Sequence, residues 1–108
     1  MSEANELTNK ILDHLYRNKV YAWRQNSTGI WDKTKGIYRP SGKKGVSDIL
    51  GCLPPTGKLL AIEVKIGRDH TSDEQKGFLS NVKSCGGIAL AVKTYEDFLE
   101  QWAWISTS

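Results

Sequence analysis

Charged side chains interrupt an otherwise apolar stretch at residues 59–65, which reads LLAIEVK. Side chains alternate between the two faces of a β-strand, so Glu63 and Lys65 share one face while the opposite face is wholly aliphatic and suits a core. An ion pair in such a strand must offset the cost of removing both charges from water. Taken alone, the two residues could form an ordinary ion pair at a strand end.

A second carboxylate lies in a similar setting. Residues 46–51 read VSDILG, and Asp48 is flanked by apolar residues on its own face. If the Pro-Pro-Thr-Gly turn that follows joins two neighbouring strands, Asp48 and Glu63 can reach one cation. Two carboxylates that close would repel unless a divalent ion lies between them, and oxygen ligands suit Mg²⁺ or Mn²⁺ rather than zinc.

A helix and a further strand follow these segments. We expect a helix over residues 72–83 that ends at Gly86-Gly87, and a strand over residues 88–93 (IALAVK). A strand–helix–strand crossover predicts a parallel pair. Gln75 falls on the apolar stripe of this helix and therefore points inward. Its alternative role is to complete a capping box with Ser72.

The remaining helices and strands are predicted on either side of the segments that carry Asp48, Glu63 and Gln75. We predict a helix capped by Ser2 and running to about residue 18, a strand over residues 20–25, a long loop or ragged hairpin over residues 26–45, and a final helix over residues 95–104. The predicted fold is α/β, with a mixed β-sheet flanked by helices in the order αβββαβ plus a C-terminal helix. Residues 1–104 would form a single domain, with residues 105–108 as a frayed tail.

The size and charge of the chain limit which kinds of protein it can be. The chain has 108 residues and a formal net charge of +3, so it is one mildly basic domain for which dimerisation would supplement a modest core. Cys52, Cys85, His14 and His70 lack zinc-finger spacing. The sequence shows no membrane-spanning stretch or secretory leader. We therefore expect a soluble intracellular protein with no membrane partner, in a bacterial cytoplasm or a phage-infected cell.

The strings GVSDILG and AIEVK, with a downstream glutamine on a helix, resemble the D…ExK signature of the PD-(D/E)XK nuclease superfamily. More narrowly, the chain resembles a stand-alone VRR-NUC domain, the virus-type replication-repair nuclease. The segments WRQNSTG, TSDEQKGFL and CGGIALAVKTYEDF agree with this family. The resemblance extends from the first helix to about Phe98 and implies a restriction-endonuclease-like core.

The resemblance implies catalytic roles. Asp48 and Glu63 would bind Mg²⁺ or Mn²⁺ together with the Val64 carbonyl, and Lys65 would orient or deprotonate the attacking water. Gln75 would join this cluster. The family also carries a glutamate on its first helix. Glu3 lies beside the apolar stripe of that helix whereas Glu6 points away, so Glu3 is the preferred candidate.

The resemblance also implies DNA as the partner. Arg24 and Asn26, which could otherwise simply close a turn with Gln25, would lie near the DNA backbone. Lys43 and Lys44 belong to a basic cluster in the following loop that either is simply solvated or clamps DNA. The expected activity is structure-selective cleavage of branched DNA by a homodimer similar to Holliday-junction resolvases. The alternatives are a flap, nick or sequence-specific endonuclease, and a non-catalytic DNA-binding module.

Overall fold

The computed structural model describes residues 2–25, 30–39 and 45–107. These residues form three helices and six strands in the order α1, β1, β2, β3, β4, β5, α2, β6, α3. Their bounds are α1 Glu3–Arg17, β1 Tyr21–Arg24, β2 Ile30–Asp32, β3 Ile37–Arg39, β4 Ile49–Leu53, β5 Lys58–Val64, α2 Asp73–Ser84, β6 Ile88–Val92 and α3 Tyr95–Thr107.

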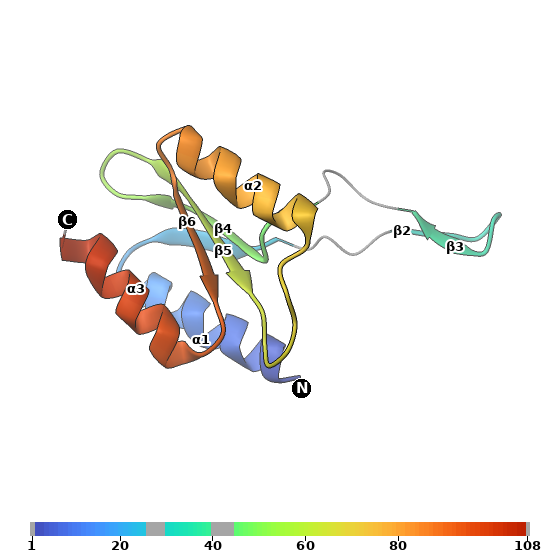
Figure 1. Ribbon diagram of the computed structural model, residues 1–108, viewed down its shortest axis with the longest axis horizontal. Coiled ribbons are helices and arrows are strands. Elements are labelled where there is room, and N and C mark those ends of the chain that lie inside the picture. Colours follow the sequence, from blue (N-terminus) through green and yellow to red (C-terminus); the bar gives the residue numbers. More distant parts are fainter. Residues whose placement is uncertain (1, 26–29, 40–44, 108) are drawn as a thin grey trace.

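Four strands form the main sheet in the order β1-β4-β5-β6. The β1–β4 and β4–β5 pairs are antiparallel, and α2 crosses over to make β6 parallel to β5. Helices α1 and α3 lie on one face of the sheet and α2 lies on the other (Figure 1). The predicted α/β fold with a mixed sheet flanked by helices is therefore confirmed.

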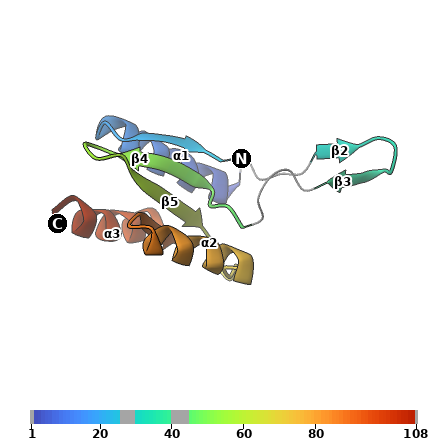
Figure 2. The same cartoon turned by 90° about the horizontal axis from the view of Figure 1, so that it is seen from above.

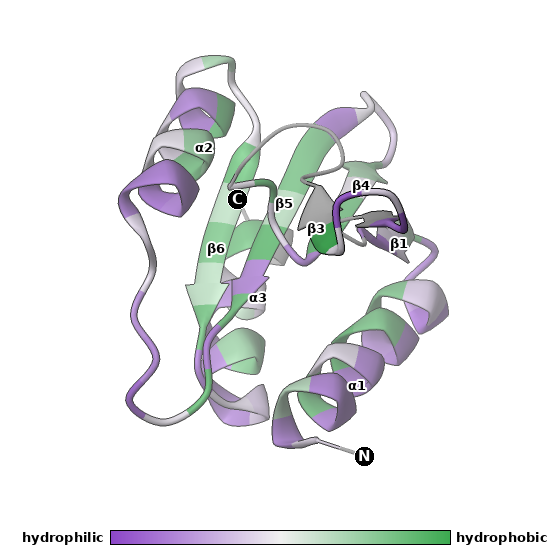
Figure 3. Cartoon of the chain, turned by 90° about the vertical axis from the view of Figure 1, so that its right-hand side faces the viewer, coloured by the Kyte–Doolittle hydropathy of each residue, from purple (hydrophilic) through white to green (hydrophobic). Residues whose placement is uncertain are grey.

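The main core lies between the sheet, α1 and α3. The α1 side chains at the i, i+4 and i+8 positions of the predicted stripe, Leu7, Ile11 and Leu15, are buried against the aliphatic face of β5. Figure 3 shows hydrophobic residues along β5 and β6. His14 packs edge-on against Phe98 and Trp102 of α3, which supports a structural role for this histidine.

The segment predicted as a loop or ragged hairpin contains a separate two-stranded hairpin, β2–β3. Asp32 Oδ1 accepts hydrogen bonds from the Thr34 and Lys35 amides, which closes its turn. Figures 1 and 2 show the hairpin projecting beyond the end of the sheet where β1 ends and β4 begins. Lys33 and Lys35 are exposed on this projection.

The predicted boundaries differ most from the structure at two places, by three residues each. β4 begins at Ile49 rather than at residue 46, and α3 continues to Thr107, beyond the predicted end at residue 104. Asp48 directly precedes β4, and its side-chain oxygen Oδ2 accepts a hydrogen bond from the Val64 amide (2.8 Å). Among the described residues, no helix combines the length and hydrophobicity that crossing a lipid bilayer requires.

Candidate active site

Three strands bring polar groups together at one end of the sheet. The β4–β5 register pairs Ile49 with Ile62, so continuing it by one residue sets Asp48 opposite Glu63. Asp48 Oδ2 accepts the hydrogen bond from the Val64 amide at 2.8 Å. The Asp48 carbonyl accepts another from the amide of Gln25, which directly follows β1 (2.7 Å). Asp48 is thereby fixed between β1 and β5.

Glu63 is a charged residue at a buried position of β5. Its side chain is 1% exposed, and Oε1 accepts a hydrogen bond from Gln75 Nε2 at 3.1 Å. The same oxygen lies 3.9 Å from Lys65 Nζ, so the two charged residues of β5 do form an ion pair. Oε2 is buried and has no hydrogen-bond partner among the described residues. Such an oxygen is costly unless something else binds it.

Burial has a direct effect on the titration of Glu63. Desolvation, followed by the interaction with the Asp48 carboxyl, raises the pKa of Glu63 from 4.5 to about 8, and the Lys65 ammonium partly opposes this rise. In the absence of a cation the Glu63 carboxyl therefore holds a proton at neutral pH. A bound cation would have to displace that proton.

Gln75 performs both of the tasks predicted for it. Ser72 Oγ accepts a hydrogen bond from the Gln75 amide, and Gln75 Oε1 accepts one from the Ser72 amide at 2.9 Å, which completes the capping box. The side-chain nitrogen is then left to donate to Glu63. The start of α2 is thereby tied to the end of β5, and the capping role and the inward role are compatible.

The backbone before Asp48 passes unusually close to α2. Gly45 has φ +78°, and a Cβ built on it would lie 2.5 Å from both the carbonyl carbon and the oxygen of Glu74. Only glycine fits such a contact without displacement of the backbone. Gly45, three residues before Asp48, is thus held against the first turn of α2, which also contains Gln75.

Residues 4–94 match the VRR-NUC domain in a comparison with known protein families. The chain belongs to the VRR-NUC family. The family identifies it as a nuclease domain, and the substrate that this implies is DNA. No curated protein and no solved structure matches the chain.

Four of the residues predicted for the active site of this VRR-NUC domain lie close together. Asp48, Glu63, Lys65 and Gln75 lie in one cluster, connected by the contacts described above. Their individual catalytic roles stay predictions. Arg24 is exposed at the end of β1, next to Gln25, whose backbone amide donates to the Asp48 carbonyl. Asn26, Lys43 and Lys44 lie outside the described residues.

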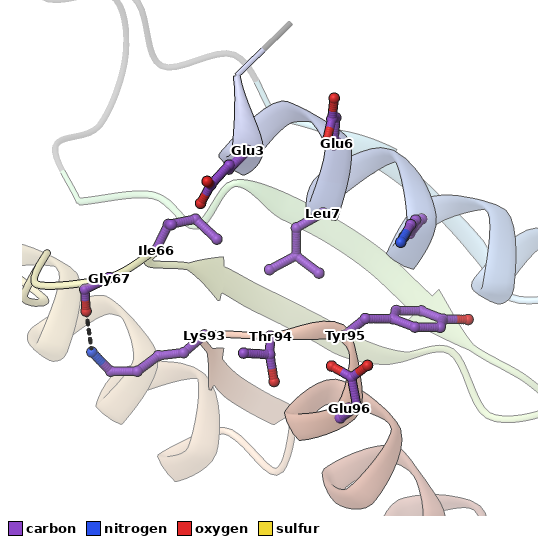
Figure 4. Close-up of a pocket in the computed structure, with 10 residues that line it drawn as sticks. Glu3, Glu6, Leu7, Ile66, Gly67, Lys93, Thr94, Tyr95 and Glu96 are labelled. Atoms are coloured by element: carbon purple, nitrogen blue, oxygen red, sulfur yellow. Dashed lines mark hydrogen bonds between the residues drawn. The ribbon is translucent and has the colours of Figure 1, made fainter.

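Glu3 and Glu6 both line a cavity of about 380 Å³ between α1, the chain that follows β5 and the start of α3. Figure 4 shows the Glu3 carboxylate pointing toward Ile66, one residue beyond Lys65, while that of Glu6 points away from it. The same opening is bounded by Lys93, whose ammonium donates to the Gly67 carbonyl at 3.2 Å. This geometry is compatible with Glu3 rather than Glu6 as the acid of the first helix, which stays a prediction.

The cluster has the donor chemistry of a site for a hard divalent cation. Asp48 and Glu63 provide carboxylate oxygens, and the buried Glu63 Oε2 lacks a partner. Within the described part of the chain, no group of three Asp, Glu, His or Cys side chains could hold a metal. Mg²⁺ commonly takes only one or two carboxylates and completes its octahedral shell with other oxygens. The residues therefore fit Mg²⁺ or Mn²⁺ better than zinc.

Sequence reasoning did not predict two features around this cluster. The importance of Gly45 depends on the approach of α2 and leaves no local pattern. Tyr21 and Trp23 are 73% and 38% exposed on the edge strand β1. Their signal was present in the sequence as two aromatic residues at i and i+2 on one face of a predicted strand.

Proposed function

We propose that this VRR-NUC domain is a Mg²⁺- or Mn²⁺-dependent endonuclease that hydrolyses phosphodiester bonds in DNA. The observation that carries the proposal is the buried Glu63 carboxyl set against the Asp48 carboxyl, with no described N–H group donating to Glu63 Oε2. A purely structural carboxyl at 1% exposure would be expected to have both oxygens hydrogen-bonded. The free-energy cost of burying this carboxyl oxygen is offset if the oxygen binds a cation in the working enzyme.

The residues around Glu63 each have a role in this proposal. Gln75 holds one Glu63 oxygen, and the Val64 amide holds one Asp48 oxygen, so both carboxylates are oriented before a cation arrives. The Val64 carbonyl is proposed as a further ligand. When bound, the cation supplies positive charge that polarises the scissile phosphate and makes hydroxide available near neutral pH. Glu3 is proposed as an additional acid beside the cluster.

Lys65 is proposed to act on the nucleophile and the phosphate. Its side chain is 23% exposed, so it is partly buried beside Glu63 but reaches solvent. An ammonium there can orient the attacking water and balance negative charge that develops on the phosphate. Arg24 is proposed to contact the DNA backbone near the end of β1, where it would fix the position of the strand.

Cleavage assays with added Mn²⁺ or Mg²⁺ test the proposed activity. The wild type should cut DNA, and EDTA should abolish the cutting. Glu63→Gln and Lys65→Ala should each lower the cleavage rate by at least about 100-fold, as expected for groups that act on the transition state, while DNA binding persists. A non-catalytic binding module would bind DNA but show no metal-dependent cleavage of linear, nicked, flap or four-way DNA.

The proposed substrate is a four-way junction, cut by a homodimer. A two-fold axis relating two copies would present two active sites to two opposing strands. Junctions with differently labelled strands should then yield paired cuts within one encounter, and sedimentation should give a dimer mass. Cutting of one strand only, or a preference for flaps or nicks, would favour the alternative endonuclease substrates.

A further inference from the structure

Among the described residues, no helix covers the β1–β4 half of the sheet face that carries Asp48 and Glu63. On this face α2 packs over β5 and β6, where Val82 contacts the buried Ala61 and Ala89. The antiparallel registers place side chains of β1, β4 and β5 in cross-strand rows on the same face. The exposed or half-buried members of these rows, which we call the aromatic patch, are Tyr21, Trp23, Leu50, Cys52 and Leu59.

Two rings dominate the aromatic patch. Tyr21 and Trp23 lie with ring centroids 5.3 Å apart and planes inclined by 50°. The exposed fractions, 73% for Tyr21 and 38% for Trp23, are high for large aromatic residues. Both side chains are on the edge strand of the sheet, so their outer sides are accessible from solvent.

Trp23 is connected to the candidate active site. Its indole Nε1 donates a hydrogen bond to Gln25 Oε1 at 3.2 Å, and the Gln25 amide donates to the Asp48 carbonyl at 2.7 Å. The row of Trp23 is adjacent to the row of Gln25, Asp48 and Glu63, because residues two apart on a strand face the same way. The distance between such rows is about 7 Å. Because β1 is one strand from Asp48 and two strands from Glu63, at about 4.8 Å for each strand, the ring is within reach of nucleotides next to the cleaved phosphate.

We propose that the aromatic patch binds unpaired bases of the DNA strand whose phosphate lies at Asp48 and Glu63, with Trp23 and Tyr21 as the stacking rings. This inference rests on the proposed function and adds to it a preference for nucleotides next to the cleaved bond that are unpaired or become unpaired at the branch point of a junction. Stacking on an aromatic ring tolerates any base, because every base has a π-face. Helix α2 covers the β5–β6 side of the carboxylates, so the open side lies over β4 and β1.

The position of the patch favours DNA over a second copy of the chain. A protein partner seated on Trp23 would sit within one row of Asp48 and Glu63 and would obstruct the access of phosphate to them. A nucleotide strand, in contrast, must continue on at least one side of the phosphate.

A set of matched DNAs tests the proposal. The cleaved phosphate is first mapped with the wild type and Mn²⁺. Three versions of the DNA are then compared, in which the three nucleotides beside that phosphate are paired, unpaired, or unpaired and abasic. Affinity is measured by fluorescence anisotropy in EDTA, so that no cleavage intervenes. The variants are Trp23→Leu, Trp23→Phe and Tyr21→Leu, with Tyr16→Leu as the control at an 81% exposed tyrosine on α1.

Trp23→Leu should weaken binding of the unpaired DNA by about 10-fold, the usual effect of losing one stacking ring. Trp23→Phe should restore most of that affinity because it keeps a ring. Abasic nucleotides should remove the difference between Trp23→Leu and the wild type, which makes the comparison a double-mutant cycle. Tyr21→Leu, at a more exposed position where folding is less at risk, should show the same pattern, and Tyr16→Leu should show none.

The outcomes separate this inference from the proposed function. If the wild type cuts none of the DNAs, the proposed function is overturned and the inference with it. If the wild type cuts, but Trp23→Leu weakens paired, unpaired and abasic DNA equally, only the inference is overturned. An equal loss accompanied by conversion of a dimer into a monomer in sedimentation would instead assign the aromatic patch to an interface between copies.

Discussion

Glu63 determines how the metal-free protein responds to pH. Its pKa is raised from 4.5 to about 8 in the folded chain, so between these values the folded state keeps a proton that the unfolded state has released. The contribution of the protonated group to stability is complete below pH 4.5 and is lost as the pH rises to about 8. The wild type in EDTA should therefore lose stability across this range relative to Glu63→Gln.

Thermal melting of both proteins in EDTA between pH 5 and 9 measures this effect. The difference in Tm should grow in favour of Glu63→Gln up to about pH 8 and then level off. Added Mn²⁺ should raise the Tm of the wild type more at pH 8 than at pH 6, since the ion competes with the proton. A Tm difference that does not change with pH would show that Glu63 ionises normally.

The Gln75 side chain makes two hydrogen bonds, one that caps α2 at Ser72 and one to Glu63. Two substitutions separate their effects. Gln75→Glu keeps the oxygen that accepts from the Ser72 amide but replaces the donor to Glu63 with a like charge. It should reduce cleavage strongly at little cost in helix capping. Ser72→Ala should cost about 1 kcal/mol of unfolding free energy, as for other lost caps, and keep cleavage. If Gln75→Glu and Ser72→Ala cut DNA at similar rates, the hydrogen bond from Gln75 to Glu63 is not needed for cleavage.

The site residues could be predicted from the sequence because their signals are local. A period of two places Glu63 and Lys65 on one face of β5, and a period of 3.6 places Gln75 on the inward stripe of α2. The turn at residues 54–57 has proline and glycine, so the pairing of the strands that present Asp48 and Glu63 also followed from local chemistry. The unpartnered Oε2 could not be predicted, because it depends on how three strands and a helix converge.

At the scale of elements, the boundaries were less accurate than the elements themselves. Residues 46–48 have strand-like composition, yet β4 begins only at Ile49. In this segment Gly45 lies against α2 and the Asp48 side chain accepts the Val64 amide, so its tertiary contacts differ from those of a regular strand. The open half of the sheet was equally unpredictable, since the sequence of α2 does not show how far across the sheet the helix reaches.

Gly45 lies before β4 and contacts the first turn of α2, so its replacement should lower stability and displace the active-site residues that follow it. Gly45→Ala combines an unfavourable positive φ, worth about 1–2 kcal/mol, with a clash against the Glu74 backbone that typically costs a further 1–3 kcal/mol, roughly as for overpacking. Gly57→Ala is the matched control, because Gly57 has φ +82° and nothing within 4 Å of the added Cβ.

Urea denaturation and cleavage assays compare the two glycine variants. Gly45→Ala should lose more stability than Gly57→Ala and should also cut DNA more slowly at temperatures where it is fully folded, since Asp48 would be displaced. Equal losses of stability with unchanged cleavage would mean that the contact with α2 does not position the site.

At the scale of the whole molecule, the β2–β3 hairpin extends the surface beyond the end of the sheet where Asp48 lies (Figure 1). Lys33 and Lys35 are exposed on it, so DNA seated at the carboxylates can extend onto the hairpin. Lys33→Gln with Lys35→Gln should weaken DNA binding uniformly across sequences. It should also make the slope of log affinity against log salt shallower by about 2, one phosphate contact for each lysine. The control pair, Lys19→Gln with Lys58→Gln, lies at the opposite end of β1 and β5 and should change neither quantity. Titrations at several salt concentrations measure both slopes, and equal slopes for the two pairs would mean that the hairpin takes no part in holding DNA.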